Sequence, residues 1–288
     1  MASTWGEVAM DAVVEEAVEY MRAFFGDPLT VAGIAERSRL GSFLFSRVFK
    51  EETGVSPGQF LAAVRMGEAK RLLESTSLDI AGIAAAVGHG GSGAFTDHFT
   101  AAVGLTPGGF RRLCRDAGQV LPGPRPEPGA GLGALAGTVR LPRGYGTARV
   151  YLGVFATPVV RYPALAEALV DVPGDRPSCY RLPDVPEGSR HLLAVAVAAG
   201  VGAGRGPEDG RSVLVGRHGT VRTTVAVTAG TVTGAAVRLR PPHPADPPVL
   251  LALPGLLPAR TVVPQPGCAA APGAQPVALR PPPRPSGA

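Results

Sequence analysis

An arginine and a lysine stand three residues apart in the stretch SFLFSRVFKEE, as Arg47 and Lys50. An exposed guanidinium can donate two parallel hydrogen bonds to O6 and N7 of guanine, and a lysine ammonium can pair with a phosphate. The serines beside them can donate to, or accept from, base edges. These residue types could therefore recognise duplex DNA, a task that makes and breaks no covalent bond.

The two phenylalanines that flank Arg47 decide which neighbouring side chains are available. Phe45 and Phe49 are four residues apart, so on a helix both pack from one side onto a preceding helix. The residues on or near the outer face are then Ser42, Phe43, Ser46, Arg47 and Lys50. Taken alone, Arg47 and Lys50 also fit a plainer interpretation, a solvated helix face that binds nothing.

The first part of the chain contains the same pattern twice, which favours the binding interpretation. Residues Leu29, Ala32, Gly33, Ile34 and Ala35 recur 49 residues later as Leu78, Ala81, Gly82, Ile83 and Ala84. Residues Phe45, Phe49, Gly54, Pro57 and Phe60 recur 50 residues later as Phe95, Phe99, Gly104, Pro107 and Phe110. Two copies of one supersecondary unit explain both sets.

Each copy has the local signals of a helix-turn-helix. Thr30 and Asp79 can cap the first helix of each unit, and Gly54 can end the second helix of the first unit. Ser56-Pro57-Gly58-Gln59 is a capping box with proline at the first helical position, and it starts a helix that joins the copies. Two helices held by a rigid connector could enter successive major-groove segments, about 34 Å apart.

Charge argues against this interpretation and has to be weighed. Residues 1–120 carry 11 Lys and Arg against 14 Asp and Glu, a net of −3, and the remainder carries 17 against 9, a net of +8. A DNA-binding domain is usually basic. An interaction adaptor, whose helical part no longer reads DNA, is therefore the alternative function.

Residues from about Met10 to Arg115 resemble the DNA-binding domain of AraC/XylS-type transcription regulators. The matching segments are PLTVAGIAERSRLGSFLFSRVFKEETGVSPGQFLAAVRMGEAKRLL and SLDIAGIAAAVGHGGSGAFTDHFTAAVGLTPGGFRR. The resemblance implies recognition helices near residues 42–52 and 92–102. By position, it implies that the second helix presents Ser92, Gly93, Thr96 and Asp97 to DNA, as the first presents Ser42, Phe43, Ser46 and Arg47, with Lys50 reaching a phosphate.

Three features depart from the family pattern. The family often has a basic residue near Asp97, where a carboxylate repels phosphate but can accept a hydrogen bond from N4 of cytosine. The turn GHGGSG is rich in glycine, which costs about 1 kcal/mol at each position inside a helix. The DNA-binding part also comes first, whereas most relatives carry it after a sensing domain, so the usual effector pocket of the family is not implied.

The rest of the chain has the pattern of β-structure. A Pro- and Gly-rich linker over residues 118–135 precedes short β-branched segments over 136–262, and a Pro-rich tail over 263–288 is expected to be disordered. DVPEGSRHLLAVAV and VTAGTVTGAAVRLRPP resemble transthyretin-like β-sandwiches. The expected fold is thus α + β in separate domains, an all-α double helix-turn-helix over residues 1–117 followed by an all-β sandwich.

The sequence offers few signs of other functions. Its five histidines form no H-x-x-x-H pair, no G-x-S-x-G motif occurs, and we expect no enzyme activity, metal or cofactor. An enzyme in the β half is the third function that stays open. The three cysteines are dispersed and suit a reducing compartment, and no signal peptide or membrane span is apparent, so we expect a cytoplasmic location.

The sequence therefore predicts a DNA-binding transcription regulator of the AraC type, and leaves both activation and repression open. The expected partners are double-stranded DNA, RNA polymerase, and a small-molecule or protein effector at the β domain. Contacts to the backbone would set register, while Arg47 and its small polar neighbours would read bases.

Overall fold

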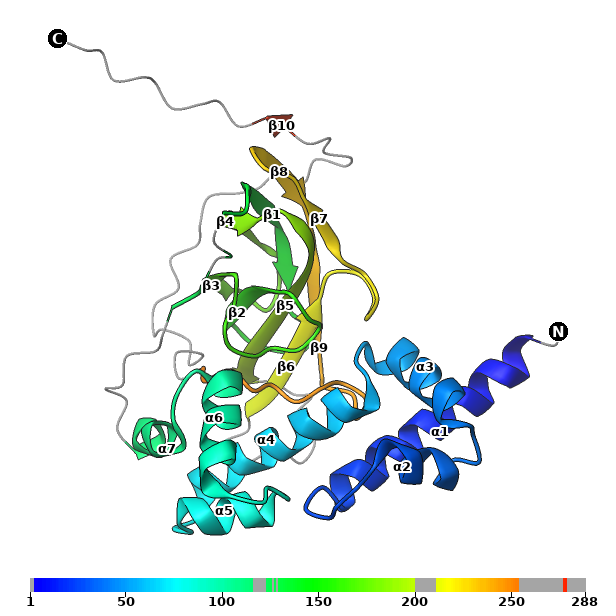
Figure 1. The fold of residues 1–288 in the computed structure, drawn as a ribbon. Coiled ribbons are helices and arrows are strands. Elements are labelled where there is room, and N and C mark those ends of the chain that lie inside the picture. Colours follow the sequence, from blue (N-terminus) through cyan, green and yellow to red (C-terminus); the bar gives the residue numbers. More distant parts are fainter. Residues whose placement is uncertain are drawn as a thin grey trace.

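The computed structural model describes residues 3–115, 123–125, 127, 129–199, 211–253 and 277–278. A helical part comes first and a sheet-rich part lies against it (Figure 1). The helices are α1 (Ser3–Ala23), α2 (Val31–Arg37), α3 (Ser42–Thr53), α4 (Pro57–Ser75), α5 (Ile80–Ala86), α6 (Ser92–Val103) and α7 (Pro107–Arg115).

The helix boundaries follow from the signals in the sequence. The side chains of Thr30 and Asp79 accept hydrogen bonds from backbone amides at the starts of α2 and α5. Ser56 and Gln59 form the predicted capping box of α4. Gly54 ends α3 with a left-handed φ of 81°, a conformation that glycine adopts without strain. These local predictions are confirmed.

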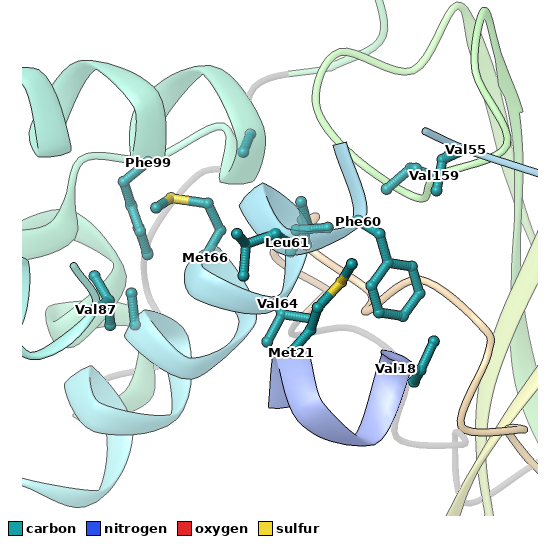
Figure 2. Close-up of a cluster of buried hydrophobic side chains, with 14 of the residues drawn as sticks. Val18, Met21, Val55, Phe60, Leu61, Val64, Met66, Val87, Phe99 and Val159 are labelled. Atoms are coloured by element: carbon teal, nitrogen blue, oxygen red, sulfur yellow. The ribbon is translucent and has the colours of Figure 1, made fainter. Parts of the chain in front are cut away.

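The repeated phenylalanines form the centre of the helical core. Phe45 and Phe49 are fully buried, with ring centroids 5.6 Å apart, and Phe95 with Phe99 repeats the arrangement at 5.7 Å. Phe60, at the start of α4, meets Phe49 edge-on. Figure 2 shows α1, α4 and the second unit contributing to one continuous cluster. The duplicated sequence thus builds two units that share one core.

The strands form one curled sheet in place of the expected sandwich. They are β1 (Leu132–Arg140), β2 (Ala148–Phe155), β3 (Ala166–Val172), β4 (Ser178–Pro186), β5 (Gly188–Ala199), β6 (Arg211–Arg217), β7 (Val225–Val227), β8 (Thr231–Gly234), β9 (Val237–Arg240) and β10 (Val277–Ala278). The main path runs β10-β8-β1-β9-β6-β5-β2-β3, with β4 on β1 and β7 on β5. The Ser178 hydroxyl of β4 donates to the Asp171 carbonyl of β3, so the sheet is a nearly closed barrel.

The all-β class predicted for the second half is confirmed, whereas the transthyretin-like sandwich is not. A sandwich needs two packed layers, but β1 pairs with β4 on one side and with β8 and β9, in parallel, on the other. The barrel encloses its own apolar core, which includes Leu135, Leu152 and Leu182. The alternation of apolar and polar residues along the sequence predicts strands, but it does not show which strands pair to close the sheet.

The predicted linker and tail are only partly within the described residues. β1 begins at Leu132, inside the span predicted as linker. Much of residues 118–128, and residues 254–276 and 279–288 of the C-terminal region, lie outside the described residues. In the tail, Val277–Ala278 pairs antiparallel with β8.

A segment after β9, residues 243–253, crosses the helical part, and we name it the strap. Arg22 of α1 donates to the carbonyls of Pro244 and Asp246, and Lys70 of α4 donates to those of Val249 and Leu251. At its far end the Ala252 amide donates to the Val103 carbonyl at the end of α6. The strap therefore contacts the first helix, the connecting helix and the second unit.

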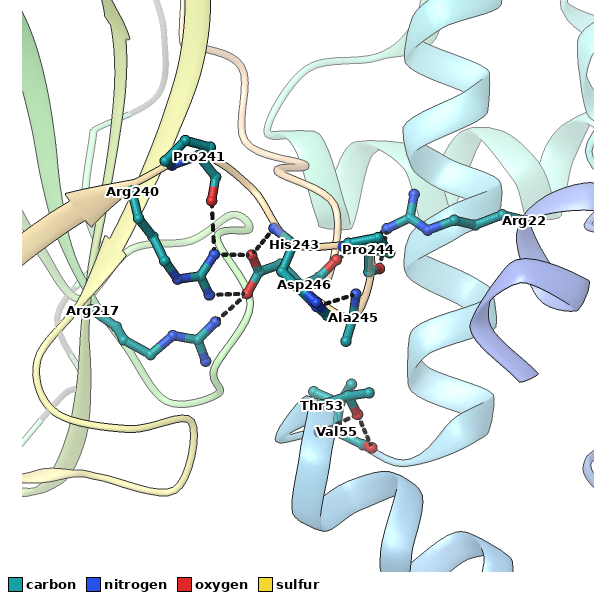
Figure 3. A network of polar contacts seen from close by, with 10 residues as sticks. All are labelled: Arg22, Thr53, Val55, Arg217, Arg240, Pro241, His243, Pro244, Ala245 and Asp246. Carbon is teal, nitrogen blue, oxygen red and sulfur yellow. Dashed lines mark hydrogen bonds and ion pairs between the residues drawn. The ribbon is translucent and has the colours of Figure 1, made fainter. Parts of the chain in front are cut away.

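A buried carboxylate ties the strap to the barrel. Asp246 accepts hydrogen bonds from Arg217, Arg240 and the amide of His243, all within 2.7–2.8 Å (Figure 3). Apolar packing also joins the parts, because Val159 of the β2–β3 loop lies in the helical core with Leu250 and Ala252 of the strap. The two halves of the chain thus share packing as well as a covalent link.

Candidate nucleic-acid interface

The first candidate helix, α3, presents the predicted residues on its outer face. Ser42, Phe43, Arg47 and Lys50 are exposed, and Ser46 is half-buried beside them. The Phe43 side chain is unusual because 84% of it is accessible to solvent. An aromatic residue left so exposed on a rigid helix can contact the methyl group of thymine. All five predicted residues of α3 thus share one accessible surface.

Arg47 is held by a carboxylate on the same helix. Its Nε donates to Oε1 of Glu51 at 3.3 Å, and Arg222, from the β6–β7 loop, approaches Oε2 of the same carboxylate at 3.5 Å. Arg222 also donates from Nε to the Glu51 carbonyl at 3.2 Å, near the C-terminal end of α3. Glu51 therefore stands between the proposed base-reading arginine and the barrel.

The second candidate helix, α6, presents a more neutral surface. Ser92, Gly93 and Asp97 are exposed and Thr96 is half-buried. No lysine or arginine occurs in α6, and its own charge is the Asp97 carboxylate beside His98. A surface of this kind gives little general attraction to phosphate. Any specific role of α6 would depend on hydrogen bonds to bases.

The two sets of residues are held apart by the connecting helix. Helix α4 has 19 residues, and a helix of that length is about 28 Å long. α3 and α6 lie towards opposite ends of α4 in Figure 1. The length of α4 is somewhat shorter than one turn of DNA, which is about 34 Å.

Residues that sequence reasoning missed lie near both candidate helices, α3 and α6. Arg222 is 171 positions from Glu51, and Arg161 donates to the Ala101 carbonyl of α6 across 60 positions. The imidazoles of His89 and His98 approach to 3.5 Å beside α6. Only the nine-residue spacing of the histidines is local enough to be noticed in the sequence. The arginine contacts depend on how the barrel docks.

Comparison with known proteins supports the helical assignment. Residues 34–113 match the family model described as a helix-turn-helix domain. The segment is 32% identical over 106 residues to the uncharacterized HTH-type transcriptional regulator YfiF of Bacillus subtilis, covering 37% of this chain and 33% of YfiF. Residues 34–113 form an AraC-type helix-turn-helix domain. The AraC-type domain comprises both repeated units, from the buried Ile34 of α2 to Leu113 of α7.

Other relatives match the same AraC-type domain. The Msm operon regulatory protein of Streptococcus mutans is 31% identical, with 35% of this chain and 36% of that protein covered. The C-terminal domain of AraT, a response regulator from Geobacillus stearothermophilus, is 35% identical over 35% of this chain and 84% of that structure, with a TM-score of 0.34. The chain spans about a third of the length of the curated relatives it matches.

Two further observations concern the setting of the domain. Among the described residues, no helix is both long and apolar enough to cross a membrane. Cys179 of β4 is disulfide-bonded, which departs from the expectation of three reduced cysteines, while Cys114 of α7 is free and exposed.

Proposed function

We propose that the chain is a sequence-specific DNA-binding transcription regulator, as the names of its relatives suggest for their own proteins. The observation that carries the proposal is the pair of exposed helices α3 and α6 within an AraC-type domain, joined by the 19-residue helix α4. α3 supplies most of the affinity because it alone of the two helices carries cations. α6 supplies base contacts of lower strength.

The proposed roles of the two halves of the chain follow the predicted domain boundaries. Residues 1–117 bind DNA, and residues 136–262 sense an effector, form a dimer or contact RNA polymerase. In the first unit Ser42, Phe43, Ser46 and Arg47 face bases and Lys50 pairs with a phosphate; in the second unit Ser92, Gly93, Thr96 and Asp97 face bases. The contacts of the strap support this division, because a change in the barrel would reach α1, α4 and α6 directly.

The test is site selection from random duplex DNA with the full chain, followed by affinity measurements on the selected duplex. Arg47→Ala is expected to weaken binding by about 1–3 kcal/mol and to relax preference at one base pair. The matched control is Arg71→Ala. Arg71 sits on α4 in a similar exposed pair, with Glu68, and has a similar exposed fraction, 61% against 67% for Arg47.

Salt dependence separates the two candidate functions. Binding that neutralises phosphates weakens steeply as salt rises, with a slope set by the number of phosphates contacted. Recovery of no motif at low salt, or equal affinity of Arg47→Ala and parent for the selected duplex, would contradict the proposal. Those results would favour the adaptor function, for which the absence of lysine and arginine from α6 is the supporting observation.

A further inference from the structure

A cavity of about 420 Å³ lies where the two helix-turn-helix units and the barrel meet. Its walls come from the first half of α4, from α6, from the β2–β3 loop and from the strap. Small-molecule sites in proteins are commonly cavities of this size, and they occur preferentially between domains. A ligand here would contact α4, α6, the β2–β3 loop and the strap at once.

Most of the cavity wall is apolar. Leu61 and Met66 of α4, Ala101 of α6, Val159 of the β2–β3 loop and Leu250 of the strap contribute to it. Val159 and Leu250 belong to the buried core, so these walls are fixed by packing. An occupant therefore needs an apolar body to gain binding energy here.

The charged side chains that line the cavity are arginines, with two histidines beside them. Arg65, Arg161, His89 and His98 line it, and none of the described lining residues is an aspartate or a glutamate. Arg65 is anchored by donating to the carbonyls of Phe25 and Asp27, so it cannot turn away. The cavity thus combines apolar walls with fixed positive charge.

His89 responds to this positive field. Burial lowers its pKa, a bond to the Val87 carbonyl raises it, and the charges of His98 and Arg65 lower it further, with a net decrease. Its Nδ1 atom is buried without a well-formed hydrogen bond. An anion placed in the cavity would offset the repulsion among these groups and offer the imidazoles an acceptor.

We propose that this cavity binds an amphipathic monoanion, a small carboxylate with an aliphatic or aromatic body, and that the bound molecule adjusts DNA binding by bracing the two units against the barrel. The carboxylate lies towards Arg161 and the histidines, and the body lies on Leu61, Met66 and Val159. The binding site stands on the cavity alone, whereas its effect on DNA rests on the proposed function.

The experiment measures binding of three matched probes to the full chain by calorimetry. Phenylbutyrate, phenylbutyramide and phenylbutylamine share an apolar body and differ in a negative, neutral or positive head group. We expect phenylbutyrate to bind roughly tenfold or more tightly than either analogue, because a charge-assisted hydrogen bond to guanidinium strengthens its binding alone. Inorganic phosphate, a charge without an apolar body, is expected to bind at least tenfold more weakly.

Two variants and one control locate the site. Ala62 lines the cavity and is exposed, so Ala62→Phe fills the space without entering the core and should abolish binding. Arg161→Gln should weaken phenylbutyrate binding roughly tenfold and leave phenylbutyramide unchanged. Arg176→Gln, an exposed arginine outside the cavity, should change neither. Thermal melting of each variant checks that it folds.

The possible results distinguish failure of the binding site, failure of its effect on DNA binding and failure of the proposed function. Equal binding of the three probes, phosphate binding as strong as phenylbutyrate, or full binding to Ala62→Phe would overturn the site. Rising pKa of His89 on addition of phenylbutyrate, followed by nuclear magnetic resonance, would support it independently. Unchanged DNA affinity at saturating phenylbutyrate would overturn only the regulatory step. Failure to bind any DNA would count against the proposed function and leave the probe result standing.

Discussion

At the scale of single residues, the most consequential contact is the one that Arg47 already makes. Its guanidinium pairs with Glu51 at 3.3 Å, and the same carboxylate is approached by Arg222. Exposed pairs of this kind contribute only about 0–1 kcal/mol, so DNA can compete for Arg47. The sequence places Arg47 on the outer face, but it could not reveal that Glu51 is shared, because Arg222 belongs to a distant loop.

Glu51→Gln is expected to raise affinity for the selected duplex by up to about fivefold, since it releases Arg47 and removes a negative charge near phosphate. The measurement is a fluorescence-anisotropy titration at low and high salt. Glu68→Gln, which removes the similar partner of Arg71, serves as the control. A loss of affinity in Glu51→Gln would mean that the carboxylate orients Arg47 for DNA, contrary to this prediction.

At the scale of elements, the helix ends were readable from sequence because caps act over three or four residues. The side chains of Thr30, Asp79 and Ser56 each accept a hydrogen bond from the backbone amide three residues later, so the local sequence is enough to predict these helix starts. The barrel was not readable in the same way. Its closure depends on β1 pairing with residues 39–54 and 98 positions away, a register that alternating apolar residues do not encode.

Gly54 is needed both for the local backbone turn that ends α3 and for the close approach of that end to the barrel. Its φ of 81° disfavours any residue with a Cβ, and an added Cβ would lie 3.2 Å from Pro158 and 3.3 Å from the Val221 carbonyl of the barrel. We expect Gly54→Ala to destabilise the chain by about 1–3 kcal/mol through strain and crowding together.

Chemical denaturation gives the free energy of unfolding of Gly54→Ala and of Gly144→Ala, and the difference isolates the effect of crowding against the barrel. Gly144 has a φ of 86°, and an added Cβ there would meet nothing within 4 Å, so its alanine variant carries the backbone strain alone. A loss in Gly54→Ala no larger than that in Gly144→Ala would show that the end of α3 does not press on the barrel.

At the scale of the whole molecule, Asp246 connects the strap to the barrel. It lies 9% exposed and pairs with Arg217 and Arg240. Removing one partner of a buried ion pair leaves uncompensated charge, so Asp246→Ala should cost about 3–5 kcal/mol in urea unfolding. Asp171→Ala, which breaks a more exposed pair with Arg149, should cost less. Equal losses would count against the strap as a structural tie.

The pH dependence of stability offers a second readout of the same group. Burial alone would raise the pKa of Asp246, but the hydrogen bonds from Arg240 and His243 and the charges of both arginines lower it below its usual 3.8. The stabilisation that Asp246 contributes is therefore fully present above the pKa that this group has in the unfolded chain. It is lost as the pH falls through the lower pKa of the folded chain. We expect Asp246→Ala to lose less stability than the parent on acidification through this range, measured by urea unfolding at each pH.

The strap also makes the AraC-type domain dependent on the rest of the chain. Val159, Leu250 and Ala252 are buried in the helical core, and none of them belongs to the first 117 residues. The sequence predicted two separate domains because the composition changes sharply after residue 117, and composition does not show which distant apolar residues return to the first core.

A fragment ending at residue 115 should therefore be less stable than the same helices in the full chain. Loss of the two larger buried side chains, Val159 and Leu250, exposes their neighbours and should cost about 2–5 kcal/mol.

Lys70 would meanwhile lose its carbonyl partners Val249 and Leu251, and its pKa, lowered by burial to about 8, would rise towards the normal value of 10.5. Hydrogen exchange of α4 amides in the fragment and in the full chain measures the difference. The α2 amides serve as the internal control, because among the described residues no hydrogen bond joins the strap to that helix. Equal protection of α4 in both would mean that the helices fold as an independent unit and that the barrel only rests against them.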